Sequence, residues 1–456
     1  MSKSINARGA GPTPKGRGPS SPSVSNQVVK AANDPPALPT HLPHTTGGGT
    51  AYALHSPDAP FPSLAFPTTR SPKTPIIPPT STLPLSDRPL MCADYDHDKR
   101  CMVVGCADHA LYEATVVRGV VGGPGVGLRT VRTLYGKTAG HSEWVTCCAY
   151  VPGGGGVVSG GMDSTLHLWH PTLPTSTPLH GHQGSITHLA CSSGPSSIAV
   201  SSSYDGTLRA WSLRTHTPLA IWGGDIDGAL ARGDYMAATR NPVLGFRWDG
   251  ARLVSLTKSG RICVFDTGVA MSRPVTSIQA HQGATRHVVT AVSCPEILTT
   301  AGNLDGCLRR FDLRVSAERG RCVRKNESLH RGGVTNLLAI PGGGLVTTGG
   351  GDGTVKVVDA DSLAVVRAVQ VVDVPAQEVG SPRASVYAMA VTQQGVGVCA
   401  FGDGVVRAVD LEGGNTVAVL DARAEGIRNA LRDIRIVEDD VVLGSGDDGI
   451  VVAWKL

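Results

Sequence analysis

The chain has 456 residues, of which 57 are glycine and only 4% are aromatic, and its net charge is +4. That length allows a large core or several domains. No apolar run of about 18 residues occurs, and the amino end lacks the apolar core of a secretory signal, so we predict neither a membrane span nor export. We therefore expect a cytoplasmic or nuclear protein, and expect the 11 cysteines to be reduced.

The amino end differs in composition from the rest of the chain. Residues 1–90 hold 18 of the 31 prolines, eight basic residues and three acidic ones, whereas the remainder holds 33 basic and 34 acidic residues. Such a segment buries too little apolar surface to offset its ordering entropy. We predict a disordered basic tail over residues 1–74 and a folded domain over residues 75–456. Nucleic acid should bind at most weakly, through the tail, because its charges are dispersed.

Two segments then repeat one pattern, residues 140–169 and residues 181–211. Each opens with Gly-His and closes with Trp. In each, a Ser stands four residues before an Asp, and the Trp follows that Asp by six. The matching residues are His141, Ser159, Asp163 and Trp169 in the first segment and His182, Ser201, Asp205 and Trp211 in the second.

Each of these side chains needs a hydrogen-bond partner once it is buried. The carboxylate can accept from the imidazole, the imidazole can bond to the hydroxyl, and the indole N–H can end the chain of bonds. A nucleophilic triad would use Ser, His and Asp as well. An active site is not expected twice at the same offsets with a Trp at its end, so we predict two structural tetrads and no catalytic residue.

A repeat of about 40 residues with Gly-His near its start and a Trp at its end resembles the WD-repeat family. The resemblance implies an all-β fold, a closed β-propeller in which each tetrad ties a loop to the inner hairpin of its blade. Eight turns with an Asp or Ser at the matching place predict eight blades, with seven as the alternative. These turn residues are Asp108, Asp163, Asp205, Ser259, Asp305, Asp352, Asp403 and Asp448.

Most units depart from the full pattern. The fifth has Ala301 where Ser is expected, and the sixth has Val358 at the place of the Trp. The last unit stops at Leu456, after its third strand. The resemblance implies that a strand from the amino side completes it, and residues 75–79 and 82–90 are the two candidates. Their prolines suit an edge strand and not a central one.

The predicted function is a non-catalytic scaffold for proteins or peptides, because no phosphate loop, paired metal motif or nucleophile elbow occurs. His97, Cys101, Cys106 and His109 are spaced too loosely for a zinc site, so we expect no metal, cofactor or small-molecule substrate. The resemblance implies docking on the face made by the loops before each first strand and by the Asp turns. Candidate binding residues on this face are Trp144, Tyr204, Arg240, Lys258, Arg286, His287, Arg331 and Arg383.

A substrate receptor of a cullin-type ubiquitin ligase is the alternative. Many WD-repeat receptors carry Trp-Asp-x-Arg at a blade end. The chain has Trp211-Ser212-Leu213-Arg214 and Phe311-Asp312-Leu313-Arg314. Each keeps the Arg and departs from the motif at one other place, with Ser for Asp in the first and Phe for Trp in the second. Arg214 and Arg314 would then contact the ligase adaptor, or else they merely cover a blade edge.

Overall fold

The computed structural model describes most of the chain from Thr74 onward. The described residues are 74–119, 125–136, 140–192, 197–223, 241–249, 251–268, 274–291, 294–315, 322–342, 344–373, 375–438 and 440–456. All of them belong to one compact unit, Ala37–Leu456. The tail predicted over residues 1–74 lies outside the described residues, apart from Thr74.

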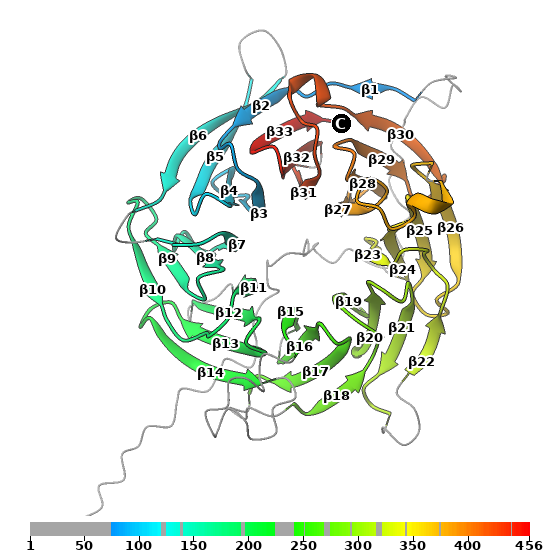
Figure 1. The fold of residues 1–456 in the computed structure, drawn as a ribbon, viewed down its shortest axis with the longest axis horizontal. Coiled ribbons are helices and arrows are strands. Elements are labelled where there is room, and N and C mark those ends of the chain that lie inside the picture. Colours follow the sequence, from blue (N-terminus) through cyan, green and yellow to red (C-terminus); the bar gives the residue numbers. More distant parts are fainter. Residues whose placement is uncertain are drawn as a thin grey trace, which may run out of the picture. The chain divides into compact units, whose positions relative to one another are not determined.

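The described strands form eight sheets, and Figure 1 shows these sheets as blades around a central axis. This is the predicted all-β propeller, with eight blades and not seven. Strands within a blade pair antiparallel in chain order, from the inner strand to the outer one. Blade one holds β3 (Leu90–Asp96), β4 (Cys101–Cys106), β5 (Leu111–Arg118) and β6 (Val126–Leu134); blade two holds β7 (Val145–Tyr150), β8 (Val157–Gly161), β9 (Leu166–Trp169) and β10 (Ser176–Leu179).

The next blades follow the same order. Blade three holds β11 (Ile186–Cys191), β12 (Ile198–Ser203), β13 (Thr207–Ser212) and β14 (Thr217–Gly223), and blade four holds β15 (Val243–Asp249), β16 (Arg252–Thr257), β17 (Arg261–Asp266) and β18 (Thr276–Gln279). Blade five holds β19 (Thr285–Ala291), β20 (Cys294–Gly302), β21 (Leu308–Asp312) and β22 (Cys322–Asn326), and blade six holds β23 (Val334–Ala339), β24 (Leu345–Gly350), β25 (Thr354–Asp359) and β26 (Val365–Gln370).

Two blades take strands from the amino side of the chain. Blade seven holds β27 (Val386–Val391), β28 (Val396–Phe401), β29 (Val406–Asp410) and β30 (Asn415–Leu420), with β1 (Ile76–Ile77) parallel to β30 as a fifth strand. Blade eight holds β31 (Leu431–Val437), β32 (Val441–Gly446), β33 (Ile450–Lys455) and, as its outer strand, β2 (Ser81–Pro84). Two short 3-10 helices, η3 (Ala376–Glu378) and η4 (Arg423–Glu425), lie in the loops that lead into blades seven and eight.

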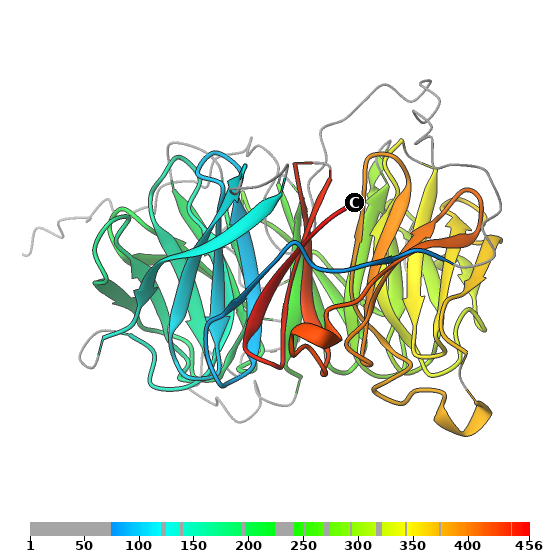
Figure 2. The ribbon, with the colours of Figure 1, turned by 90° about the horizontal axis from the view of Figure 1, so that it is seen from above.

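Strand β2 closes the ring, because it pairs antiparallel with β33. Both candidate segments are therefore used, each for a different blade: β2 overlaps residues 82–90, and residues 75–79 supply β1. In Figure 2, the blue strands β1 and β2 cross the outer side of the orange blade seven and the red blade eight. Pro84 ends β2 at the sheet edge, where its missing N–H leaves no ladder bond unmade. Closure covers the outer edge of β33, which an open ring would expose.

Apolar side chains fill the wedges between neighbouring blades. Trp211 of blade three packs with Cys147 and Leu166 of blade two, and Trp454 of blade eight packs with Val398 and Val406 of blade seven. These indoles are fully buried. Burial of a large apolar side chain stabilises the fold by roughly 1.5–3 kcal/mol, so each blade depends on its neighbours for its core.

Polar side chains also join neighbouring blades near the axis. Every inner strand has a register shift at its start, and the side chain at the shift or beside it can reach the next blade. The Thr146 hydroxyl donates to the Ile186 carbonyl at 2.6 Å, and the Thr187 hydroxyl to the Val243 carbonyl at 2.7 Å. The Asn336 amide donates to the Val386 carbonyl at 3.0 Å. These bonds hold the inner strands, and hence the loops above them, in fixed positions.

Candidate functional site

Blades two and three each bring the four predicted tetrad residues together. In blade two, His141 Nδ1 lies 2.9 Å from Asp163 Oδ2, His141 Nε2 lies 2.8 Å from Ser159 Oγ, and Trp169 Nε1 donates to the same oxygen at 2.8 Å. In blade three, the corresponding distances among His182, Asp205, Ser201 and Trp211 are all 2.8 Å. The His lies in the loop before the first strand and the Asp in the second hairpin, so each set joins that loop to its blade.

The Asp of each tetrad also accepts backbone N–H bonds, from Ser142 to Asp163 and from Gln183 to Asp205, both at 3.0 Å. Burial alone would raise the pKa of Asp205, but its bonds to His182 and Thr207 and the His182 charge outweigh burial and lower that pKa to about 2. Burial lowers the pKa of His182. An ionised carboxylate with these donors fixes the loop in place.

These side chains do not form an accessible active site. Ser159 and Ser201 are fully buried, and each hydroxyl oxygen is already engaged by an imidazole and an indole. His141, Asp163 and His167 come within 4.8 Å of one another, which is close enough to hold a metal ion. Both nitrogens of His141 face tetrad partners, however, and His167 Nδ1 lies 2.9 Å from Ser176 Oγ. The arrangement fits a structural network.

We expect His167 to make blade two sensitive to acid. Burial, together with the His141 charge, lowers the pKa of His167 from 6.5 to about 4. Between those pH values the unfolded chain binds a proton that the folded chain does not, so stability is lost as the pH falls through this window. We expect the free energy of unfolding to fall by about 2 kcal/mol from pH 6.5 to pH 4 on account of this residue.

Denaturant titrations across that pH range check the prediction. The His167→Gln variant should lose less stability over the window than the wild type. His216→Gln changes an exposed histidine in the hairpin between β13 and β14, away from His167, and serves as the control. Equal pH dependence in the wild type and His167→Gln would show that His167 does not set the acid sensitivity.

Blades five and six keep the network without the Trp. In blade six, His330 bonds to Asp352 at 3.0 Å and to Thr348 at 2.8 Å. In blade five, His281 bonds to Asp305, and its partner hydroxyl is that of Thr300 at 2.9 Å. The prediction that Ala301 takes the Ser place was therefore wrong. The hairpin of blade five is one residue longer, which moves the hydroxyl to five residues before the Asp.

Blade eight lacks two members of the network. Arg428 N donates to Asp448 at 2.8 Å, as the residue after each tetrad His does in blades two and three, so Ile427 stands at the place of the His. Gly444 stands at the place of the Ser, ten residues before Trp454. Consequently Trp454 Nε1 is buried with no hydrogen-bond partner in the described part of the chain. Apolar packing holds this blade where polar bonds hold blades two and three.

The loops before the first strands and the Asp turns lie at the same end of the blades and form the loop face. Trp144 and Tyr204 are 43% and 41% exposed on this face, and Met162 between them is 41% exposed. Hydrogen bonds through Ser185 join the three: Met162 N donates to the Trp144 carbonyl at 2.8 Å, the Ser185 hydroxyl to the Met162 carbonyl at 3.3 Å, and Tyr204 N to the Ser185 carbonyl at 2.9 Å. We call Trp144, Met162 and Tyr204 the apolar arc.

Met162 is not among the binding residues predicted from the sequence. The residue directly before the turn Asp is exposed and apolar in three blades: Met162, Tyr204 and Leu304, the last 75% exposed. The shared offset from the Asp was the available signal. The loop face thus carries large apolar side chains that the propeller itself does not cover.

The predicted cationic residues divide into three groups. Lys258, Arg331 and Arg383 are exposed in loops of this face, Arg286 is exposed as the second residue of β19 and not in a loop, and Arg240 lies outside the described residues. His287 corrects the prediction of a loop residue. It is the third residue of β19 and is half-buried, and burial lowers its pKa to about 4.

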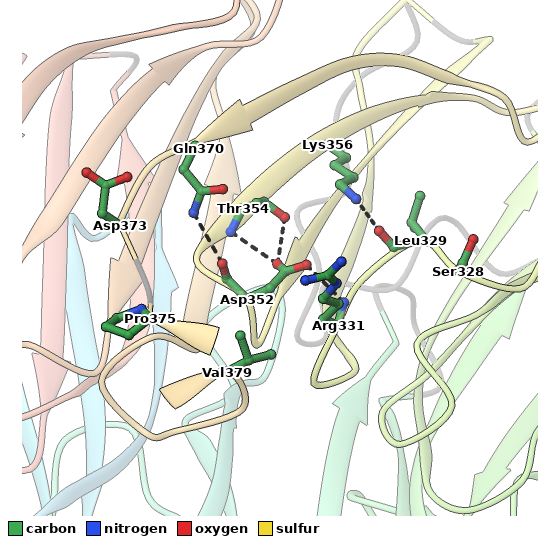
Figure 3. Close-up of a pocket in the computed structure, with 10 residues that line it drawn as sticks. All are labelled: Ser328, Leu329, Arg331, Asp352, Thr354, Lys356, Gln370, Asp373, Pro375 and Val379. Atoms are coloured by element: carbon green, nitrogen blue, oxygen red, sulfur yellow. Dashed lines mark hydrogen bonds between the residues drawn. The ribbon is translucent and has the colours of Figure 1, made fainter. Parts of the chain in front are cut away.

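One hollow on the loop face lies between blade six and the loop that leads into blade seven. It encloses about 570 Å³, and Figure 3 shows Arg331, Lys356 and Asp352 on its blade-six side and Asp373, Pro375 and Val379 on the other. Asp352 is already engaged by His330, by Thr354 and by the backbone N–H of Arg331. The volume is that of a site for a side chain or a short peptide segment.

The two arginines of the ligase alternative lie at the opposite end of their blades, in the hairpins that follow the third strands. Arg214 is exposed between β13 and β14. Arg314 donates to Asp312 of its own turn at 2.7 Å. The structure therefore does not bring these arginines together with the loop-face residues.

The fold and the tetrads together define a WD-repeat β-propeller. A family model described as "WD domain, G-beta repeat" matches residues 129–170, 173–212 and 320–359. The chain therefore carries WD40 repeats, and the resemblance seen in the sequence is confirmed. The matched ranges include both full tetrads and the Asp turn of blade six.

Curated relatives match parts of the chain. A guanine nucleotide-binding protein subunit beta from Oryza sativa subsp. indica is 26% identical over 38% of this chain and 46% of its own length. Telomerase Cajal body protein 1 from Bos taurus is 31% identical over 38% of this chain and 31% of its own length. Striatin-3 from Homo sapiens is 24% identical over 45% of this chain and 26% of its own length. The chain thus spans less than half of each of these relatives.

Solved structures share the fold. The C-terminal WD40 domain of Sif2 matches with a TM-score of 0.64 at 16% identity, over 84% of this chain and 99% of that one. The computationally designed protein Ika8 matches with a TM-score of 0.62 at 21% identity, over 83% and 99%. No helix among the described residues is long and apolar enough to span a membrane.

Proposed function

We propose that this protein is a non-catalytic scaffold that docks protein partners on its loop face. The observation that carries the proposal is the apolar arc of Trp144, Met162 and Tyr204, three large side chains that stay exposed on loops held rigid by the tetrads. Exposed aromatic side chains on a rigid frame are typical anchors of protein interfaces. The names of the relatives, a G-protein subunit and a striatin among them, fit the same class.

Other features support the same assignment. The serines of the Ser-His-Asp sets are fully buried, so these sets have no route to substrate. The ten cysteines whose side chains the structure describes form no disulfide, which fits the expected cytoplasmic or nuclear location. The ligase alternative gains nothing from the described geometry, because Arg314 is engaged within its own turn.

Trp144→Ala tests the proposal. We expect this variant to lose most of the partners that the full-length protein captures from cells, because the indole would be buried by the partner. Removal of such an anchor costs about 2 kcal/mol or more of binding energy. The melting temperature should be nearly unchanged, since the side chain is half-exposed in the free protein. Affinity capture with quantitative mass spectrometry gives the readout.

Leu173→Ala is the matched control, because Leu173 is 52% exposed on the same blade but in the hairpin after β9, at the opposite end. It should retain every partner. Tyr204→Ala should act in the same direction as Trp144→Ala. Partners that survive both loop-face variants would place the binding surface elsewhere and refute the proposal.

A further inference from the structure

A cluster of cations lies on the loop face of blades five to seven, and two of them, Arg331 and Lys356, line the hollow in Figure 3. Arg286, Arg331 and Arg383 are exposed, and Lys356 lines the hollow with Arg331. Within the described part of the chain, none of the four side chains forms an ion pair with a carboxylate. We call Arg286, Arg331, Lys356 and Arg383 the basic surface.

The backbone joins these residues into one continuous surface. A Cβ on Gly333 would lie 1.7 Å from the Asn303 carbonyl oxygen, so the loop that carries Arg331 lies directly on the turn of blade five. Asn303 N in turn donates to the Ala284 carbonyl at 3.0 Å, two residues before Arg286. Gly380 N donates to the Gly351 carbonyl at 2.8 Å, which ties the loop that carries Arg383 to the turn of blade six.

The cations outnumber the free acids of this surface. The carboxylates of Asp305 and Asp352 are engaged by His281 and His330. Two exposed acids remain, Asp373 in the wall of the hollow and Glu378 in η3, and neither forms an ion pair in the described part of the chain. Four cations have no carboxylate partner, and of these Lys356 donates to the Leu329 carbonyl, whereas two carboxylates have no cationic partner. The surface therefore has a positive balance, which favours an acidic partner.

Apolar surface stands beside these charges. Leu304 is 75% exposed in the turn of blade five, and Pro375 and Val379 line the hollow together with the cations. A site of this kind recognises a chain that alternates acidic and apolar side chains, with Arg331 and Lys356 offering charge-assisted hydrogen bonds to a carboxylate. Resting on the scaffold function above, we propose that the basic surface binds an acidic, leucine-containing segment of a partner protein.

The protein's own amino end is not the complementary occupant. Residues 1–73 carry seven basic and two acidic residues, the same sign of charge as the surface. The described chain therefore points to a segment of another protein.

Fluorescence anisotropy with the full-length chain tests the proposal. The probes are a short labelled peptide of alternating glutamate and leucine, its lysine–leucine counterpart, and a single-stranded oligothymidylate. The glutamate–leucine peptide should bind, and its affinity should fall as the salt concentration is raised, since exposed charge pairs are screened. Binding of the lysine–leucine peptide at equal strength would refute the proposal, and tighter binding of the oligothymidylate would replace it with a nucleic-acid partner.

Charge variants of opposite sign sharpen the test. Arg331→Glu should lower the affinity for the glutamate–leucine peptide by about tenfold or more, because it exchanges an attraction for a repulsion. Asp373→Asn should raise the affinity for this peptide by about twofold, because it removes an acid that faces the bound carboxylates. Arg129→Glu reverses an exposed cation on β6 of blade one and should leave affinity unchanged.

The Arg331 side chain makes no hydrogen bond within the described residues, so Arg331→Glu should fold; if it does not, Arg286→Glu repeats the test. Unchanged affinity in a folded variant would overturn the proposal. The capture assay separates the two proposals. Partners lost with Trp144→Ala but kept by Arg331→Glu would leave the scaffold function standing and remove the acidic-segment site. Partners that neither variant affects would remove both.

Discussion

Deletion of residues 1–84 should lower the free energy of unfolding by about 5 kcal/mol or more, a large share of the roughly 5–15 kcal/mol that stabilises a domain. The deletion removes β2, whose four residues pair with β33 from Ser81–Ala453 to Pro84–Ile450. It also removes the Thr80 hydroxyl bond to the Ala453 carbonyl at 3.0 Å and the Ser81 oxygen that accepts from Leu128 N of blade one at 3.1 Å. Each lost bond to a buried group costs about 1 kcal/mol, and the exposed edge of β33 adds a route to aggregation.

A series of truncations separates the two amino-side strands. Deletion of residues 1–73 leaves every described strand and is the control. Deletion of residues 1–79 removes only β1, which covers an outer edge of blade seven through two residues, and should cost far less than loss of β2. Chemical denaturation and light scattering give the readouts. If the 1–84 deletion melts like the control, β2 does not close the ring in a way that matters for stability.

The blades could be predicted because each one repeats a local signal. The Asp turns recur at near-even spacing, and the apolar strands on either side of them are long enough to recognise. For the strand that closes the ring, the sequence left two candidate segments open. Residues 75–79 and 82–90 are short and proline-containing, and their pairing depends on blades seven and eight, which lie more than 300 residues away in the chain. An edge strand that a distant partner determines leaves little periodicity of its own.

The spacing of residues in the sequence does not predict every member of the polar networks. The offset of four from Ser to Asp locates Ser159 and Ser201, but in blade five the offset leads to Ala301, whereas His281 reaches Thr300. Hairpin length and register decide which hydroxyl faces the His, and a single sequence does not reveal either. In blade eight, Trp454 matches the pattern in the sequence, but Gly444 stands at the place of the Ser and leaves the indole N–H without the partner hydroxyl.

The loop face was predictable in its location and less so in its composition. Trp144 and Tyr204 lie exposed where the resemblance put them, whereas His287 belongs to an inner strand and is half-buried. The register shift at the start of β19 turns Arg286 outward and His287 toward the interior. The hollow beside Arg331 depends on contacts between consecutive blades, such as that of Gly380 with Gly351. Contacts of this kind follow from tertiary packing and carry no sequence motif.

Asp205→Ala should lower the free energy of unfolding by about 3 kcal/mol at neutral pH. Asp205 is only 3% exposed and accepts from His182, from the Gln183 backbone and from Thr207. Alanine would leave the buried imidazole and these donors without their acceptor, and each unsatisfied buried group costs about 1–3 kcal/mol. Asp163→Ala should cost less, because Asp163 is only half-buried and water can take its place. Asp98→Ala, at an exposed turn in blade one, is the control for loss of a carboxylate.

The penalty of Asp205→Ala should depend on pH in a direction that the structure determines. Because the pKa of Asp205 is lowered from 3.8 to about 2, its ionised form stabilises the fold above pH 3.8, and that stabilisation is lost as the pH falls toward 2. The difference in stability between wild type and Asp205→Ala should therefore be full at pH 7 and shrink between pH 3.8 and pH 2. Urea titrations at several pH values measure it. A difference that is small at pH 7, or that grows on acidification, would mean that the His182–Asp205 bond does not hold the loop of blade three to its hairpin.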